Sequence, residues 1–225
     1  MKYYILIIFL FLFTVKSHGQ RVPDSLKDQL LAHATPELKS FCDSRLVKFR
    51  NNPDSAERAY PWDLRVRSTQ YIELSGKSYI ATLLGCTGLG ELVILDSANT
   101  NSKPRRIQMN FPMHYVAIKE LHDVNNDNVP ELEIYLHSGS HMAYLTLVSI
   151  YEDSLSFILD DKGYYQFGAP GGGTRIEDLD NDGIMEIILE DMIWPGEEDP
   201  PEARYFIHKW DGEKYVFSHQ EEIRK

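Results

Sequence analysis

Two nine-residue stretches with the same acidic spacing decide the fold expected for this chain: Asp123-Val124-Asn125-Asn126-Asp127-Asn128-Val129-Pro130-Glu131 and Asp178-Leu179-Asp180-Asn181-Asp182-Gly183-Ile184-Met185-Glu186. Both place an oxygen-bearing side chain at positions 1, 3, 5 and 9. An apolar stretch typical of a strand follows each one directly, over residues 132–136 and 187–189. A loop and a strand that recur together indicate a repeated supersecondary unit.

The spacing of these oxygens suits a calcium ion. In a tight loop the side chains at positions 1, 3 and 5 converge, a backbone carbonyl at position 7 joins them, and the acid at position 9 completes a shell of about six to eight oxygens. Position 6 must turn sharply, and it holds Asn128 or Gly183, which tolerate a left-handed backbone well. Because Asn125 replaces one acid in the first loop, the second loop is the stronger candidate.

Neither loop fits an EF-hand. That motif needs a glutamate at position 12, where the second loop has Leu189, and it needs helices on both sides of the loop. The alternative that stays open is a pair of Asx-type turns, in which short polar side chains cap their own backbone and no metal is bound.

Together with the strands that follow them, the loops resemble the FG-GAP or VCBS repeats of integrin α-subunit propellers and of many secreted bacterial proteins, over about residues 80–220. Phe167-Gly168-Ala169-Pro170 is close to the Phe-Gly and Gly-Ala-Pro motifs of those repeats. The resemblance implies a four-stranded antiparallel blade per repeat, calcium in the loops, and a structural or adhesive role. By motif position it assigns the ligand role to Asp123, Asn125, Asp127, Val129, Glu131, Asp178, Asp180, Asp182, Ile184 and Glu186.

The rest of the chain predicts an all-β protein with a short helical start. Residues 20–59 have helical spacing, with an Asp24-Ser25 cap before the first helix and a second helix start at Thr35-Pro36. Residues 60–225 contain short apolar segments divided by turn residues, with hairpin turns at residues 151–154 and 210–213. A third, weaker copy of the repeat runs over residues 88–95 and keeps only the closing acid, Glu91.

We therefore expect a propeller-like stack of about three antiparallel sheets. Propellers have about four to eight blades, and this β region is too short to close a seven-bladed ring. The stack would stay open, with its edges covered by the helices or by association with another chain. Gly171-Gly172-Gly173 is expected to be a flexible loop between repeats and not a phosphate cradle, because no helix follows it.

Residues 1–19 have the outline of a signal peptide. Lys2 precedes an apolar run over residues 3–15, and the small residues Ser17 and Gly19 stand before the expected cleavage point. The run is shorter than the roughly 20 residues that a membrane-spanning helix needs. We expect an exported protein, periplasmic or extracellular, with no membrane anchor after cleavage.

The two cysteines, Cys42 and Cys86, do not form a Cys-x-x-Cys motif. One disulfide could form between them in an oxidising compartment. Two small buried thiols are nevertheless the favoured interpretation.

The charge of the chain limits its partners. Its 225 residues include 34 acidic and 23 basic side chains, a net charge of -11, which excludes a typical nucleic-acid binder. The features above favour an exported calcium-binding structural or ligand-binding module with a protein or glycan partner. The alternative is a hydrolase outside the cytoplasm that uses His137 and His141 or the acidic loops, although the Gly-x-Ser-x-Gly and His-Glu-x-x-His motifs are missing.

Overall fold

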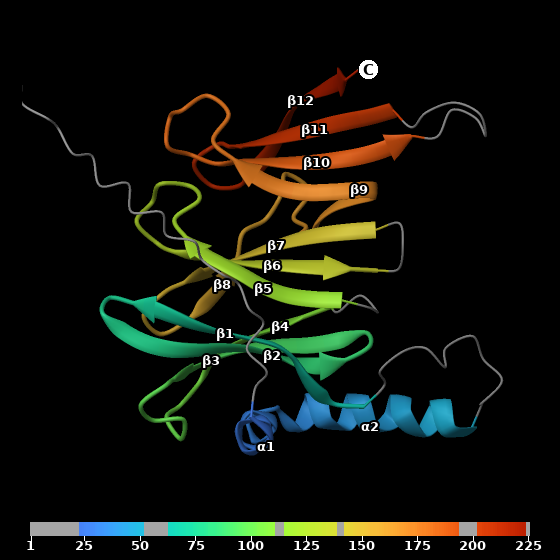
Figure 1. Cartoon of the computed structure of the whole chain (residues 1–225), viewed down its shortest axis with the longest axis vertical. Coiled ribbons are helices and arrows are strands. Elements are labelled where there is room, and N and C mark those ends of the chain that lie inside the picture. The colour runs from blue at the N-terminus through green and yellow to red at the C-terminus, as the bar shows by residue number, and fades with distance from the viewer. Residues whose placement is uncertain (1–22, 52–62, 111–114, 139–141, 194–201, 224–225) are drawn as a thin grey trace, which may run out of the picture.

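The computed structural model describes residues 23–51, 63–110, 115–138, 142–193 and 202–223. Within these ranges the chain forms two helices followed by twelve strands (Figure 1). The helices are α1 (Asp24–Ala32) and α2 (Pro36–Asn51). None of the described helices is long and apolar enough to cross a membrane.

The strands form three antiparallel units of four, in chain order. The first unit is a separate sheet of β1 (Arg65–Leu74), β2 (Lys77–Cys86), β3 (Leu89–Asp96) and β4 (Arg105–Met109). The second contains β5 (Tyr115–His122), β6 (Glu131–His137), β7 (Met142–Ile150) and β8 (Leu155–Phe157). The third contains β9 (Phe167–Glu177), β10 (Glu186–Ile193), β11 (Glu202–Trp210) and β12 (Tyr215–Ile223). This arrangement confirms the predicted all-β stack with a helical start.

The units lie one above the other, with the helices below the first unit (Figure 1). β2 is buried on both faces, which is possible because it lies between two layers. Its side chains alternate: Ile80 and Leu84 pack against the helices, whereas Ala81 and Leu83 pack against the second unit. A third core between the second and third units contains Leu145 and Leu147. Three separate cores therefore hold the stack together.

The helices begin partly as expected. Thr35 caps α2, since its Oγ1 accepts the N–H of Leu38 at 3.2 Å. The expected Asp24-Ser25 cap of α1 is wrong, because Pro23 occupies the cap position and makes no side-chain cap hydrogen bond. The structure also bridges Cys42 and Cys86, contrary to the favoured interpretation of two free thiols. This disulfide joins α2 to the last residue of β2.

The glycine run at residues 171–173 lies inside β9 and is not the expected loop between repeats. The strand changes partner there: Pro170 pairs with Met142 in β7, and Gly171 pairs with Asp191 in β10. A Cβ atom on Gly172 would lie 1.8 Å from the backbone oxygen of Glu190, so only glycine allows this approach. The run therefore joins the second and third units into one eight-stranded sheet.

The third repeat does not match the other two in strand order. Each acidic loop connects the first and second strands of its unit, whereas Glu91 lies in β3, the third strand of the first unit. The equivalent connection in the first unit is the short turn at Ser75 and Gly76. Glu91 is buried and accepts hydrogen bonds from the backbone and side chain of Thr35. It fastens α2 to the sheet. The hairpin turn at residues 151–154 forms as predicted, and the second turn forms one residue later than predicted, at residues 211–214.

Candidate metal centre

The two acidic loops lie on the same side of the stack and touch each other (Figure 1). Residues 123–130 connect β5 to β6, and residues 178–185 connect β9 to β10. Glu131 and Glu186 are the first residues of β6 and β10, so each closing acid is anchored in a strand. The N–H of Met185 donates to the backbone oxygen of Val124 at 2.8 Å. The repeat thus brings two equivalent loops into contact.

The loops share four hydrogen bonds, position by position. The acid at position 1 accepts the N–H groups of positions 5 and 6, at 3.1 and 2.8 Å in the first loop and at 3.2 and 3.1 Å in the second. The acid at position 5 accepts the N–H of position 7 at 2.8 Å in both. Oε2 of the closing glutamate accepts the N–H of position 2, at 3.0 and 2.8 Å. The sequence repeat therefore specifies one backbone shape.

The backbone at two positions of each loop is left-handed. Asn128 and Gly183, at position 6, have φ angles of 66° and 85°, as the sequence predicts. Asn126 and Asn181, at position 4, also have positive φ, at 59° and 61°. The second feature escapes sequence reasoning based on metal spacing, although asparagine is the residue that tolerates this region best after glycine.

The second loop gathers three of its predicted ligands. One oxygen atom each from Asp178, Asp180 and Glu186 lies within 4.8 Å of the other two, so this partly buried group could hold a metal ion. Asp182 is not part of the group, and its Oδ1 supports the turn at Ile184. The ammonium of Lys209 in β11 lies among these oxygens, 2.5 Å from Asp180 Oδ2 and 3.2 Å from Glu186 Oε1. The hydrogen bond from Lys209 lowers the pKa of Asp180.

The first loop contains a buried oxygen that lacks a partner. Glu131 is fully buried, and its Oε2 accepts the N–H of Val124. Its Oε1 has no hydrogen-bond partner within the part of the chain that the structure describes. Burial raises the pKa of Glu131 to about 7; the Val124 N–H and the Ser149 side chain act against this rise, and the charges of Asp127 and Asp123 add to it. An ionised carboxylate at this place is costly unless a cation reaches it.

The other predicted ligands of the first loop hydrogen-bond within the loop, but its acids do not form a group as close as Asp178, Asp180 and Glu186, the one such group among the described residues. Asp123 and Asp127 accept backbone N–H groups of the loop, and Asn125 donates its Nδ2 to Asp127 Oδ2 at 3.1 Å. Val129 stands at position 7, where its N–H donates to Asp127. An amide that donates to a neighbouring acid offsets part of the repulsion within the loop.

The hydroxyl of Tyr215 contacts the backbone of both loops. It donates to the backbone oxygen of Met185 at 2.9 Å and approaches that of Val124 at 3.5 Å. Tyr215 is fully buried, and burial together with the nearby acids raises its pKa, so the hydroxyl stays protonated and donates. Sequence reasoning missed both Tyr215 and Lys209. Their proximity to the loops depends on how β11 and β12 pair, which residue spacing within the loops does not reveal.

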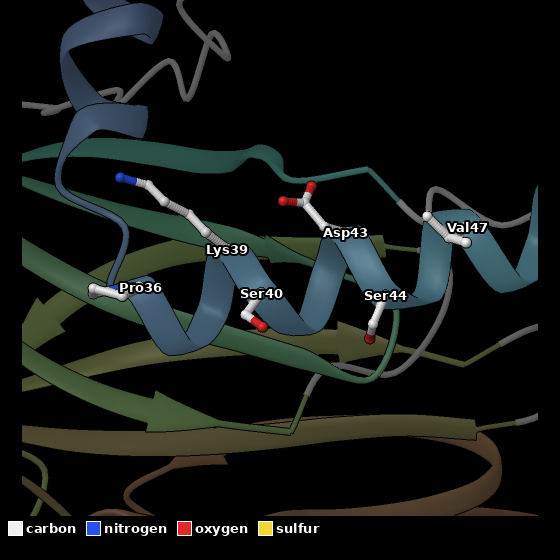
Figure 2. A pocket seen from close by; sticks show the side chains of 6 residues that line it. All are labelled: Pro36, Lys39, Ser40, Asp43, Ser44 and Val47. Carbon is white, nitrogen blue, oxygen red and sulfur yellow. The ribbon is translucent and has the colours of Figure 1, made fainter.

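Two surface depressions in the described part of the chain differ in how close they lie to the loops. One, of about 780 Å³, runs along α2, and all six residues that line it belong to that helix (Figure 2). The other, of about 420 Å³, lies beside the loops and is lined by residues of β5, β6, β9 and the second loop, among them Lys119, His122, Glu133 and Arg175. His122 Nε2 lies 3.1 Å from Glu133 Oε1 there. The groove beside the loops is the more polar of the two.

The structure describes only one of the two histidines, His137 and His141, that the sequence offers as catalytic groups. His137 is the exposed last residue of β6, and His141 lies outside the described residues.

Comparison of the chain with protein-family models, with curated proteins and with solved structures finds no match.

Proposed function

We propose that this chain is an exported, calcium-binding module of the FG-GAP or VCBS type, in which bound calcium stabilises the contact between the second and third units. The ligand residues in this proposal are Asp123, Asn125, Asp127, Val129 and Glu131 in the first loop, and Asp178, Asp180, Asp182, Ile184 and Glu186 in the second. The role is structural, and the partner is a protein or a glycan that contacts the surface loops.

The observation that carries the proposal is the unpartnered Oε1 of Glu131. Buried polar atoms are rarely left without a partner, and each exception needs an explanation. Here the atom belongs to a carboxylate beside two other acids, Asp123 and Asp127, whose charges make its ionisation harder. A bound cation removes both difficulties at once. Asx turns alone explain the backbone of the loop but leave this oxygen without a partner.

The chemistry of the donors favours calcium over other cations. Carboxylate, amide and carbonyl oxygens are hard ligands, and an irregular loop with many of them suits the flexible coordination of calcium. Magnesium prefers a rigid octahedron and keeps several waters, and zinc prefers histidine and cysteine. Calcium supplies charge neutralisation, while the residues of the chain fix the loop that receives it.

Export is supported by the disulfide between Cys42 and Cys86, since such bonds persist in oxidising compartments. Calcium sites of extracellular modules commonly have dissociation constants of about 10⁻⁴–10⁻³ M. The proposal does not require a catalytic group.

Elemental analysis and thermal melts of the purified protein test the proposal. We expect retained calcium and a melting temperature about 5–10 °C higher in excess calcium than in EDTA, because an ion at a hundred times its Kd contributes about 2.7 kcal/mol. Magnesium at the same concentration should have little effect. A protein that retains no calcium and melts at the same temperature in calcium and in EDTA would contradict the proposal.

A further inference from the structure

The two loops have the same backbone but face different residues across the sheet. In the second unit, Glu131 pairs with Ser149 in β7. In the third unit, Ile187 pairs with His208 in β11, which places the next residue, Lys209, opposite Glu186. Because β7 and β11 are the third strands of their units, Ser149 and Lys209 are equivalent positions.

This single position changes the charge inside the site. Ser149 is buried and neutral, and Glu131 Oε1 beside it has no hydrogen-bond partner in the described chain. Lys209 is charged, and its ammonium contacts carboxylate oxygens of Asp180 and Glu186, two of the three acids that could hold a metal ion. A lysine is ordinarily charged at neutral pH, so this position brings a positive charge into the second loop.

We infer that Lys209 is a built-in counter-ion of the second loop that competes with calcium, so that the first loop is the tight calcium site and the second the weak one. This inference rests on the proposed function. The number of acids alone predicts higher calcium affinity at the second loop, and the inference reverses this order of affinities.

Electrostatics gives the reason. An ion entering the second loop must displace the ammonium from two carboxylates or accept a positive charge a few ångströms away, and either costs binding free energy. The Lys209 side chain is 39% exposed, so it can move into water once displaced. Among the described residues no lysine or arginine forms an ion pair with the first loop, so an ion entering it displaces no such cation and gives Glu131 Oε1 a partner.

Lys209→Met tests the inference, since methionine keeps much of the length of the side chain and removes its charge. Calcium is titrated by calorimetry into EDTA-treated and dialysed protein. For the wild type we expect one tight site and a second site at least tenfold weaker. Lys209→Met should tighten the weak site at least tenfold and leave the tight site unchanged. Lys77→Met, at an exposed lysine at the start of β2 in the first unit, is the matched control and should behave as wild type.

The assignment of the two sites needs a second variant. Glu131→Gln should remove the tight site, and Glu131→Gln combined with Lys209→Met should keep only the strengthened one. Two wild-type sites of equal affinity, or a weak site that Lys209→Met leaves unchanged, would overturn the inference while leaving calcium binding intact. No calcium binding by either wild type or Lys209→Met would instead overturn the proposed function.

Lys209→Met leaves Asp180 and Glu186 without a counter-ion, and the variant could therefore unfold in the absence of calcium. The experiment still tests the inference in that case. In that case circular dichroism should show refolding when calcium is added, as expected if calcium takes the place of the ammonium. Failure to refold at millimolar calcium would overturn the inference.

Discussion

The loops at residues 123–131 and 178–186 have the same hydrogen bonds and the same left-handed positions, yet their charges are neutralised differently. In the second loop Lys209 supplies a positive charge from the neighbouring strand. In the first loop Ser149 stands at that place, and Glu131 Oε1 has no hydrogen-bond partner in the part of the chain that the structure describes. The comparison teaches that a loop motif fixes the shape of a cation site, whereas residues outside the motif decide whether the site needs a cation.

The largest effect is expected when the buried acid of the first loop is made neutral. Glu131→Gln keeps the shape of the side chain and an oxygen for the N–H of Val124, but it removes the charge that needs calcium. We expect at least a hundredfold loss of calcium affinity at the first loop, measured by calorimetry. Glu177→Gln, at an exposed position in β9, is the control and should bind as wild type. Tight binding retained in Glu131→Gln would place the ion elsewhere.

The raised pKa of Glu131 predicts a pH dependence for the EDTA-treated protein. The folded state holds the proton more tightly than the unfolded chain, because its pKa is about 7 instead of 4.5. Below pH 4.5 the Glu131 carboxyl is neutral in both the folded and the unfolded protein, so it does not lower the free energy of unfolding. As the pH rises from 4.5 to 7 the folded state loses stability, and above pH 7 the full cost of about 3 kcal/mol is present.

Urea unfolding at pH 5 and pH 8, compared between wild type and Glu131→Gln, measures this cost. The variant removes it, so the difference between the two proteins isolates Glu131 from other groups such as His208, whose pKa is lowered by burial. Equal pH dependence in both proteins would show that Glu131 is not buried as a free acid.

Removal of the hydroxyl between the loops should have an intermediate effect. Tyr215→Phe keeps the buried ring but leaves the backbone oxygen of Met185 without its donor, which costs about 1–2 kcal/mol. Because the hydroxyl contacts both loops, calcium binding should weaken severalfold at both sites. Tyr151→Phe, at an exposed turn, is the control. Weakening at only one loop would show that Tyr215 does not couple them.

The smallest effect is expected when the first loop is given an acid at position 3, as in the second loop. Asn125→Asp adds a negative charge to the first loop but removes the amide that donates to Asp127. We expect calcium binding at the first loop to tighten by a few fold, and the melting temperature in EDTA to fall by a few degrees. Unchanged melting in EDTA would mean that repulsion within the loop is unimportant.

The sequence predicts those parts of the fold that local patterns specify. The helices, two hairpin turns, both loops and the left-handed position 6 follow from short-range spacing and turn residues. The stack of three four-stranded units follows from the repeat, because one such unit cannot bury its apolar faces alone.

The errors arise where distant segments meet. The glycine run at residues 171–173 reads as a loop, but close approach of Glu190 makes it the bend of a shared strand. Likewise, Lys209 and Tyr215 reach the loops only through the pairing of β11 and β12. Their role depends on strand register, which spacing within the loops does not contain.

A crystal structure grown with one equivalent of calcium tests the central claim most directly. We predict one ion in the first loop, bound to Glu131 Oε1, with the Lys209 ammonium still in contact with Asp180 and Glu186 in the second. An ion in the second loop alone, or a first loop in which only water contacts Glu131, would contradict the account.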